Sequence, residues 1–411
     1  MMRTLTRLFA VIYVATLWLP TLQRAFHLFP ELQLYGSEQK PERVQLSVKG
    51  WFDGTYVAKY EPFFNYRLGL RSYLVRTYNQ LDFTLFRMVP RQAGSQVVIG
   101  KDGMLYEQVY IQRYNRASKA SDEKLRRIAR RARQLQDELQ QRGVAMLVVI
   151  APSKVEVYPE NVPDGMLKPG REQRKTAYDA IMPLLDEFGV NYIDGPRLFK
   201  EWKNDYPYPL FPLTGVHWNY LGAARITELI MQDLERLTGK KLPQIEIEDV
   251  KVDDQIRGTD NDLGELLNVW TCGELLNLWT FKKDAGPQYH PVIRRLADES
   301  TYVPDILFVG DSFVHTLNEL MDEHMLYRQR DTLYYHKRRF TPESPKGAPY
   351  NRDLFDMKKD LLGRDALVLE INEYWMPDIG FGFVKDALAF FGKQDAGDDD
   401  KAEDAGGEAL R

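Results

Sequence analysis

The chain has 411 residues, of which 44% are hydrophobic and 12% aromatic, and its formal net charge is −4. A chain of this length and apolar content is expected to bury a substantial core in one large domain or two modest ones, which argues against a disordered protein. The charge balance gives no indication of nucleic-acid binding. Cys272 is the only cysteine, so an intramolecular disulfide and a cysteine-based metal or redox site are excluded.

The N-terminal segment has the pattern of a membrane anchor. Arg3 and Arg7 precede an apolar run from Leu8 to Leu22, and Arg24 follows it. The run of about 15 residues is short of the ~20 that span a bilayer comfortably, but it approaches the lower limit of ~17 when flanking residues are counted. No small-x-small cleavage site follows, so we favour an uncleaved signal-anchor over residues 1–30, rather than a cleaved signal peptide or a buried core helix. The basic residues before the run would stay in the cytoplasm, which places the domain in the periplasm of a bacterium, anchored in the inner membrane.

Residues 31–95 form an aromatic-rich lead-in to the main domain. A helix that packs on that domain is predicted by apolar residues at helical spacing: Leu74, Tyr78, Leu81 and Leu85. The stretch "VVIGKDGMLYE", residues 97–107, places a Lys-Asp-Gly turn between two short apolar runs, which predicts a hairpin.

A long amphipathic helix is predicted between Ser121, a suitable N-cap, and Gly143, a suitable stop. Its apolar stripe consists of Leu125, Ile128, Ala132, Leu135 and Leu139. Its clustered arginines are interpreted as a solvated face, with an anion-binding or membrane surface as the alternative. The apolar run from Val144 to Pro152 then predicts a strand buried on both faces, as in a parallel sheet.

Helices and apolar strands continue to alternate along the rest of the chain. Helices are predicted over 175–188 and 220–237, and strands in "VNYID", "DILFVGDSF", "TLYYH" and "DALVLEINEYW". This alternation indicates a three-layer α/β domain over residues 96–392 with a central, mostly parallel sheet. The acidic tail, residues 393–411, is almost free of large apolar residues and is expected to be disordered.

The strongest local signal for chemistry is "ILFVGDSFVHTL". A buried strand runs into Gly310, Asp311 and Ser312, and a helix is expected to start at once. A serine on such a turn is exposed at the carboxyl end of the sheet, where amides of the turn, Gly310 and Asp311 included, can hold an oxyanion. The alternative is that Ser312 only caps the following helix.

His217, in "TGVHWN", is the candidate general base. It follows a glycine and precedes a predicted amphipathic helix, so it lies on a loop near the end of an element. A lone histidine is more often structural, but the other five (His27, His290, His315, His324 and His336) have no comparable context. His315, three residues after Ser312, is interpreted as helix packing rather than as a base.

Several blocks of the chain, taken together, resemble the alginate O-acetyltransferase group with an SGNH-hydrolase-like domain. "GDSF" is similar to the serine block of SGNH hydrolases, and "HW" before "NYLGA" resembles the Asp-x-His-Trp block of that group. The similarity extends roughly from Phe63 to Tyr374, with the histidine block before the serine block. The other similar blocks are "FNYRLGLRSYLVRTYN", "VVIGKDGMLY", "VVIAPSKVEVYPENVPD" and "DNDLGELL".

The resemblance implies a periplasmic, membrane-anchored protein that acts on a secreted, alginate-like polysaccharide. Its implied partner is a membrane-bound O-acyltransferase that supplies the acetyl group. The resemblance implies Ser312 as the nucleophile and His217 as its base. No cofactor is expected, and no spaced cluster of His, Asp or Glu indicates a metal site.

One position departs from the family pattern, because the acidic residue of Asp-x-His-Trp falls on Gly215. The acid that orients His217 is therefore unknown from the sequence. Its loss would lower kcat by about 10⁴-fold, or roughly 5 kcal/mol, unless another group replaces it. The possible replacements are Asp260, Asp262, Asp194 or a backbone carbonyl, while Thr214 and Asn219 could hydrogen-bond the ring without supplying charge.

Three functions are consistent with these residues. The first is an O-acetyltransferase that uses a Ser312 acyl-enzyme. The second is a catalytically weakened subunit that binds polysaccharide or acts as a scaffold, which Gly215 motivates. The third is a hydrolytic esterase with water as the acceptor. If His217 were an active but poorly oriented base, Gly215→Asp would be expected to raise esterase turnover.

Overall fold

The computed structural model describes residues 2–36, 40–89, 97–118, 120–170, 173–270 and 285–393. The chain divides into two compact units, one of residues 1–97 with 264–284 and the other of residues 98–263 with 285–411. The described residues 264–270 thus belong to the first unit, whereas the sequence placed them within one continuous domain. Cys272 and the predicted tail beyond Lys393 lie outside the described residues.

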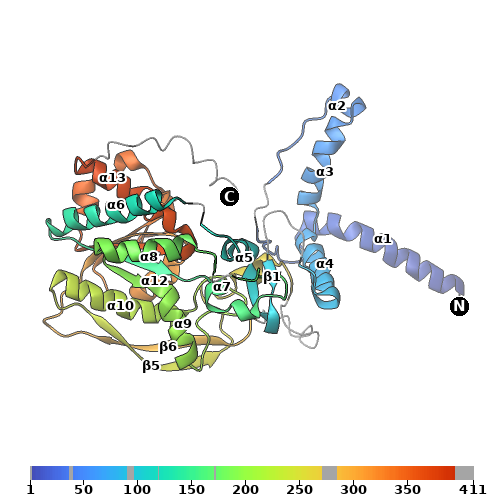
Figure 1. The fold of residues 1–411 in the computed structure, drawn as a ribbon. Helices are drawn as coiled ribbons and strands as arrows, with labels where there is room; N and C mark the ends of the chain where they lie inside the picture. The colour runs from blue at the N-terminus through green and yellow to red at the C-terminus, as the bar shows by residue number, and fades with distance from the viewer. Residues whose placement is uncertain are drawn as a thin grey trace. The chain divides into compact units, whose positions relative to one another are not determined.

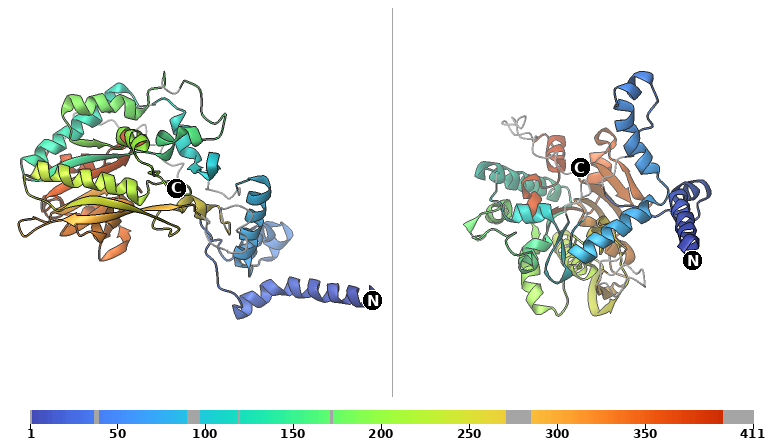
Figure 2. Two further views of the ribbon diagram at one scale, coloured as in Figure 1. Left: turned by 90° about the horizontal axis from the view of Figure 1, so that it is seen from below. Right: turned by 90° about the vertical axis from the view of Figure 1, so that its right-hand side faces the viewer.

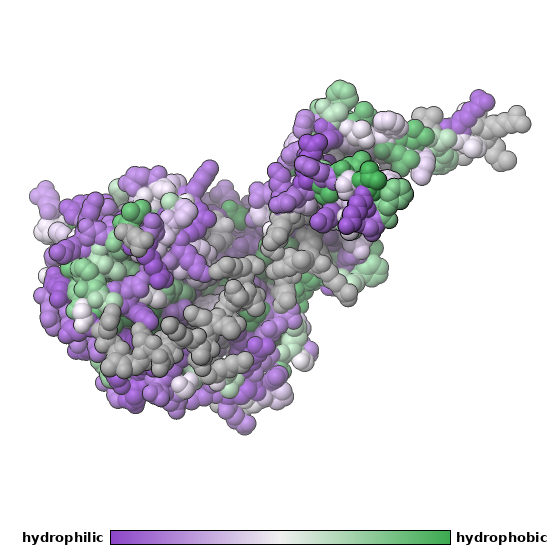
Figure 3. Space-filling model, turned by 90° about the horizontal axis from the view of Figure 1, so that it is seen from above, coloured by the Kyte–Doolittle hydropathy of each residue, from purple (hydrophilic) through white to green (hydrophobic). Residues whose placement is uncertain are grey.

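The first unit is helical. Its helices are α1 (Met2–Phe26), α2 (Val48–Phe52), α3 (Thr55–Arg67) and α4 (Arg71–Phe86). It exposes large apolar side chains, such as Phe52 at 84%, and Figure 3 shows hydrophobic surface gathered on it. Among the described residues, no helix has both the length and the apolarity to cross a membrane. The anchor expected over residues 1–30 therefore stays a prediction.

Helix α4 forms where the apolar spacing predicted a helix, but the predicted face is wrong. All four residues of the expected stripe are exposed, and the side chains that α4 buries are Asn79, Gln80 and Phe83. Asn79 donates to the carbonyl of Leu267 (3.0 Å), and the side-chain oxygen of Gln80 accepts from the amide of Trp270 (2.8 Å). The helix is thus held through polar contacts with a segment of its own unit, which apolar periodicity does not detect.

The second unit is built on a mixed seven-stranded sheet with the order β10-β9-β8-β7-β11-β3-β4. Five neighbouring strands are parallel, and β9 and β10 extend the sheet in antiparallel fashion. The strands are β3 (Ala145–Ala151), β4 (Tyr192–Asp194), β7 (Asp305–Gly310), β8 (Gln329–Tyr334), β9 (Arg338–Thr341), β10 (Ser344–Pro349) and β11 (Ala366–Asn372). The predicted α/β fold with a mostly parallel sheet is confirmed.

Two hydrophobic cores lie on opposite faces of this sheet and make the domain three-layered. Alternate residues of β3, β7 and β11 enter each core, as the period of a strand requires. One core contains α6 (Asp122–Gln140), α8 (Ala177–Phe188) and α13 (Phe383–Phe390); the other contains α9 (Gly195–Asp205), α10 (Tyr220–Thr238) and α12 (Val314–Glu323). Figures 1 and 2 show α13 beside α6, and α10 beside β5 and β6.

The helix boundaries follow the expected capping chemistry. Ser121 caps α6 by accepting from the amide of Lys124 (3.2 Å), and Gly143 has a positive φ of 78° after the helix. The side chain of Asn219 caps α10 by accepting from the amide of Gly222 (2.9 Å). The loop that contains His217 therefore ends at Asn219, where the cap fixes the start of α10.

The remaining elements lie around this framework. They are β1 (Val97–Ile99) and β2 (Leu105–Glu107), which form the predicted hairpin, α5 (Gln108–Tyr114), α7 (Lys154–Val157), α11 (Asp262–Leu266), and the antiparallel pair β5 (Gln244–Asp253) and β6 (Gln288–Leu296). Short 3-10 turns cover Lys101–Gly103, Pro159–Asn161, Arg352–Leu354 and Glu373–Asp378, and a π-helical turn covers Met357–Leu361. The sequence did not predict the β5–β6 pair.

Candidate active site

Ser312 lies at the carboxyl end of β7, on the turn that leads into α12. The side chain is partly exposed, whereas every residue of β7 is buried. A Cβ atom on Gly310 would come within 2.7 Å of Oε2 of Glu370, so the close approach of β11 requires glycine here. The predicted strand, turn and helix around the serine are thus present.

Asp311 supports this turn with its buried carboxyl group. Its Oδ1 accepts from the amide of Phe313 (2.9 Å), and its Oδ2 accepts from the amide of Asn372 at the end of β11 (2.8 Å). Oε2 of Glu370 accepts from the amide of Asp311 (3.0 Å), and the two carboxyl groups also share a hydrogen bond. Burial raises the pKa of both groups, so the pair retains a proton, and Asp311 shapes the turn rather than acting on substrate.

His217 finds its carboxylate in Asp262, which lies 45 residues further along the chain. Nδ1 of the imidazole lies 2.6 Å from Oδ2 of Asp262. Oδ1 of the same carboxylate accepts from the amides of Val216 and Leu263, both at 2.8 Å. These bonds fix the carboxylate against the histidine loop, so Nδ1 of His217 carries the proton and Nε2 is the basic nitrogen.

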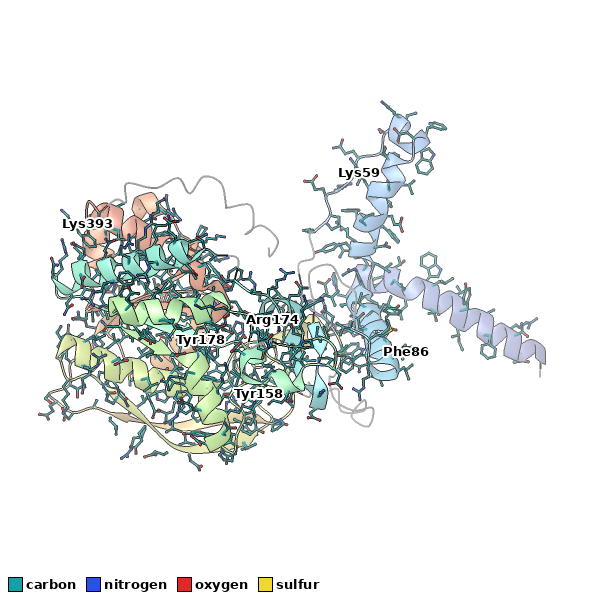
Figure 4. The ribbon with its side chains drawn as sticks, in the orientation of Figure 1. Lys59, Phe86, Tyr158, Arg174, Tyr178 and Lys393 are labelled. Carbon is teal, nitrogen blue, oxygen red and sulfur yellow. The ribbon has the colours of Figure 1, made fainter. Side chains whose placement is uncertain are left out.

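The other candidates for the orienting acid have different partners. The Asp260 carboxylate accepts from the amide of Arg257 (3.3 Å), and burial raises its pKa to about 7. Asp194 caps α9 and accepts from the hydroxyl of Tyr178 (2.7 Å), which Figure 4 labels on α8. The Thr214 hydroxyl donates to the carbonyl of Asp260 (3.3 Å), and the side chain of Asn219 donates to Pro209 (2.7 Å), so neither bonds the ring.

The structure also explains why a glycine precedes His217 by two residues. A Cβ atom on Gly215 would lie 2.5 Å from the carbonyl oxygen of Thr259 and 3.0 Å from that of Asp260. The backbone of the segment that carries Asp262 therefore occupies the space that an acid at 215 would need. In this chain, the acid beside His217 comes from the loop packed against the histidine loop.

Aromatic contacts bring His217 next to the serine turn. The imidazole meets the ring of Phe313, the residue after Ser312, at a centroid distance of 4.7 Å, and Trp218 meets the same ring at 5.3 Å. Nε2 of His217 is buried and has no hydrogen-bond partner among the described residues. The two predicted site residues are thus gathered at one edge of the sheet, without a direct hydrogen bond between them.

His315 is excluded as the base by its surroundings. Its ring packs against Tyr334 at 5.0 Å and Phe340 at 5.4 Å, and burial lowers its pKa to about 4. The prediction that it packs within the fold is consistent with these contacts.

Sequence reasoning missed Lys154, which is buried below the histidine loop. Its Nζ donates to the carbonyls of Leu105 (3.0 Å) and Leu213 (3.1 Å), and so ties β2 to that loop. Burial lowers the pKa of Lys154 to about 7, and the charge of Asp262 acts against this shift. The sequence did offer a signal for this buried lysine, because Lys154 directly follows "VVIAPS", the end of a buried strand and its turn.

Tyr158 is a second support of the histidine loop that sequence reasoning missed. Its hydroxyl accepts from the amide of Leu210 (3.0 Å), and its ring meets Phe211 edge-on; Figure 4 labels this side chain. Glu107, at the start of α5, lies where the charges of Asp262 and His217 act on it, and burial raises its pKa. Within the described residues, no group of three or more His, Cys, Asp or Glu is arranged to hold a metal ion.

Comparisons with known proteins find chains that are similar to this one. The probable alginate O-acetylase AlgJ of Pseudomonas aeruginosa is 30% identical over 150 residues, which cover 36% of this chain and 34% of AlgJ. The match thus spans about a third of that relative's length. The O-acetyltransferase domain of Pseudomonas putida AlgJ aligns with a TM-score of 0.42 and 18% identity over 69% of this chain and 92% of that domain. Pseudomonas aeruginosa AlgX aligns with a TM-score of 0.41 and 16% identity, over 71% of this chain and 66% of AlgX.

The comparison that decides the family covers more than half of the chain. A family model described as the SGNH hydrolase-like domain of acetyltransferase AlgX matches residues 97–324, which include His217, Asp262 and Ser312. The chain belongs to this alginate O-acetyltransferase-like family.

Proposed function

We propose that the protein is an O-acetyltransferase that moves an acetyl group through Ser312 to a hydroxyl of a secreted, alginate-like polysaccharide. The observation that carries this proposal is the His217–Asp262 pair beside the serine turn. A weakened relative would not be expected to keep a carboxylate 2.6 Å from Nδ1 of the base after losing the acid at 215. The family and the name of the AlgJ relative support the substrate class.

Each residue has a defined task in this reaction. The basic Nε2 of His217 takes the proton of Ser312 as its oxygen attacks the acetyl carbonyl carbon, and Asp262 stabilises the resulting imidazolium. The bond between the acetyl carbon and the donor's oxygen then breaks, and His217 returns the proton to that oxygen. In the second half, His217 takes the proton of a sugar hydroxyl as its oxygen attacks the acetyl carbon. The bond from that carbon to the Ser312 oxygen then breaks, and His217 returns the proton to Ser312.

We further infer that the domain works in the periplasm, anchored in the inner membrane by its N-terminus, and receives acetyl groups from a membrane-bound O-acyltransferase. The arginines that precede the apolar run of α1 and the exposed apolar surface of the first unit support this location. Fractionation of cells that produce the full chain tests it, because a wholly soluble product would contradict the anchor.

Acetyl transfer from p-nitrophenyl acetate to an uronic-acid oligosaccharide tests the reaction. We expect acetylated oligosaccharide with the wild-type chain and none with Ser312→Ala. The control Ser300→Ala, on an exposed loop twelve residues earlier, should stay active. Release of acetate at the same rate with and without acceptor would favour the hydrolytic esterase. Binding of the oligosaccharide without any reaction of the wild type would favour the scaffolding subunit.

A further inference from the structure

Arg113, near the end of α5, is a partly buried arginine that stacks on an aromatic ring. Its guanidinium carbon lies 3.8 Å from the ring centroid of Trp375, and its Nη1 donates to the carbonyl of Tyr374 (3.2 Å). Within the residues that the structure describes, no carboxylate pairs with Arg113. In α6, by contrast, Arg126 and Arg133 each form an ion pair with an acidic side chain. The charge of Arg113 is therefore not neutralised by a neighbour.

Helix α5 connects this arginine to the histidine loop. The strand β2 comes directly before α5, and the amide of Leu105 in β2 donates to the carbonyl of Leu213, four residues before His217 (2.8 Å). From Gln108, where α5 begins, to Arg113 the helix rises only ~8 Å. A short helix therefore separates the guanidinium from the histidine loop.

The aromatic partner of Arg113 connects it to the serine turn. Trp375 stands three residues after Asn372, the last residue of β11. The amide of Asn372 donates to the carboxyl group of Asp311, the residue before Ser312 (2.8 Å). Three residues of chain reach at most ~11 Å, so Arg113 and Trp375 lie at the edge of the sheet that carries the serine turn.

The protein contacts leave one edge of the guanidinium free. Among residues 371–376, which the structure describes throughout, only Trp375 is not buried. Nε and Nη2 of Arg113 have no hydrogen-bond partner among the described residues, and neither atom is buried. A guanidinium whose plane is fixed by an indole ring presents these two N–H groups in the geometry that fits both oxygens of a carboxylate. The arrangement thus suits an anion that arrives from solvent.

We propose that Arg113 binds the carboxylate of a uronate residue in the acceptor polysaccharide, with Trp375 as the platform that orients its guanidinium. This inference rests on the proposed acetyl transfer and deepens it, because it names the group by which the acceptor is selected. A uronate held at Arg113 supplies the carboxylate that the arginine lacks within the protein. It also keeps the neighbouring sugars of the same chain beside Ser312. Arg113 positions the acceptor and takes no part in the bond changes.

The acceptor selectivity of the full chain tests this site. p-Nitrophenyl acetate supplies the acetyl group, and the acceptors are a uronic-acid oligosaccharide and the same oligosaccharide with its carboxyl groups reduced to alcohols. We expect the wild type to prefer the uronate form. Arg113→Gln should lower the ratio of kcat/KM for the two acceptors by roughly 10- to 100-fold, the usual contribution of a hydrogen bond to a charged group. Arg116→Gln removes the same charge from an exposed position and should keep the wild-type ratio.

Two further measurements support this test. Binding of the uronate oligosaccharide to the Ser312→Ala chain, with and without Arg113→Gln, reports on the site in the absence of turnover, and we expect affinity to fall by the same factor. Arg113→Lys keeps the charge but loses the paired N–H groups, so its selectivity should lie between those of the wild type and Arg113→Gln. It provides the same comparison where Arg113→Gln does not fold.

The outcomes separate this inference from the proposed function. A wild type that acetylates the uronate form, with the same ratio in Arg113→Gln, overturns the site and leaves the acetyl transfer standing. An equal fall in the ratio in Arg113→Gln and Arg116→Gln indicates general attraction by positive charge, which also overturns the site. A wild type that acetylates neither acceptor overturns the proposed function. Binding to the Ser312→Ala chain that depends on Arg113 would then still support the site, and binding that does not would overturn it as well.

Discussion

The serine turn and the histidine loop reach the same edge of the sheet but are assembled differently. The turn is made from consecutive residues of a strand, a turn and a helix, and its supporting carboxyl, Asp311, is the residue directly before Ser312. The histidine loop instead receives its carboxylate from Asp262, on a separate segment. The nucleophile can therefore be identified from consecutive residues of the sequence. The acid that orients its base cannot, because folding brings it from a distant segment.

The two carboxyl groups also differ in their surroundings. Asp311 is 1% exposed, and its carboxyl group accepts from backbone amides and from Glu370. These bonds stabilise the backbone conformation of the serine turn. The side chain of Asp262 is 27% exposed and divides its two oxygens between the loop and the imidazole. Asp262 is therefore the carboxylate whose charge acts on His217. Removing it should impair catalysis and leave the serine turn intact.

Asp262→Asn should have the largest effect. The amide can still accept from Val216 and Leu263, but it stabilises the wrong tautomer of His217 and supplies no charge to the imidazolium. We expect kcat for acetyl transfer to fall by about 10⁴-fold, as it does when the aspartate of a serine-protease triad becomes asparagine, with little change in stability. Steady-state kinetics and thermal unfolding measure the two quantities.

Asp260→Asn is the matched control for this prediction. Asp260 lies two residues earlier on the same segment, and its carboxyl group accepts from the amide of Arg257, whereas Asp262 bonds the imidazole. It should retain most of the activity. Loss of activity in Asp260→Asn with a normal Asp262→Asn enzyme would contradict the assignment of Asp262.

The same contrast explains which features the sequence could predict. The buried strands, the cap at Ser121 and the strand–turn–helix around Ser312 depend on neighbouring residues, and each was predicted. The face of α4 and the partner of His217 depend on segments far away in the sequence, namely the 267–270 backbone and Asp262. Asp262 was one of several carboxylates that the sequence offered, and only the packing of two loops distinguishes it from Asp260 and Asp194.

Gly215→Asp should have a smaller effect. It adds an acid to the histidine loop, whereas Asp262→Asn removes one. The sequence suggested that it would raise turnover by restoring a missing acid. The structure reverses this expectation, because the added atoms would meet the carbonyl oxygens of Thr259 and Asp260 and displace the segment that carries Asp262. We expect a loss of about 1–3 kcal/mol in the free energy of unfolding, together with lower kcat.

Gly215→Ala separates the steric effect from the charge in this prediction. It should lower stability in the same way, since its Cβ atom alone makes the clash. Denaturant unfolding and kinetics of the two variants give the comparison. Higher turnover in a stable Gly215→Asp protein would show that His217 lacks an effective carboxylate in solution.

The smallest effect concerns Glu373, which follows β11 on the side of the serine turn. Burial raises its pKa to about 8, the charge of Glu156 adds to this shift, and the Ser153 hydroxyl donates to its Oε1 (2.6 Å). The unfolded chain releases this proton near the ordinary glutamate pKa of about 4.3. Between that value and about 8, rising pH therefore lowers the free energy of the unfolded state relative to the folded state, and stability falls.

Glu373→Gln should flatten this dependence, because the amide cannot ionise yet can still accept from Ser153. The slope removed is at most about 1.4 kcal/mol per pH unit. Denaturant unfolding at several pH values across this window measures it, with Glu201→Gln, an exposed glutamate, as the control that keeps the wild-type slope. Equal slopes in all three proteins would mean that Glu373 is already ionised in the fold. The serine side of the sheet edge would then hold more negative charge than its buried carboxyl groups suggest, and that charge would oppose an oxyanion beside Ser312.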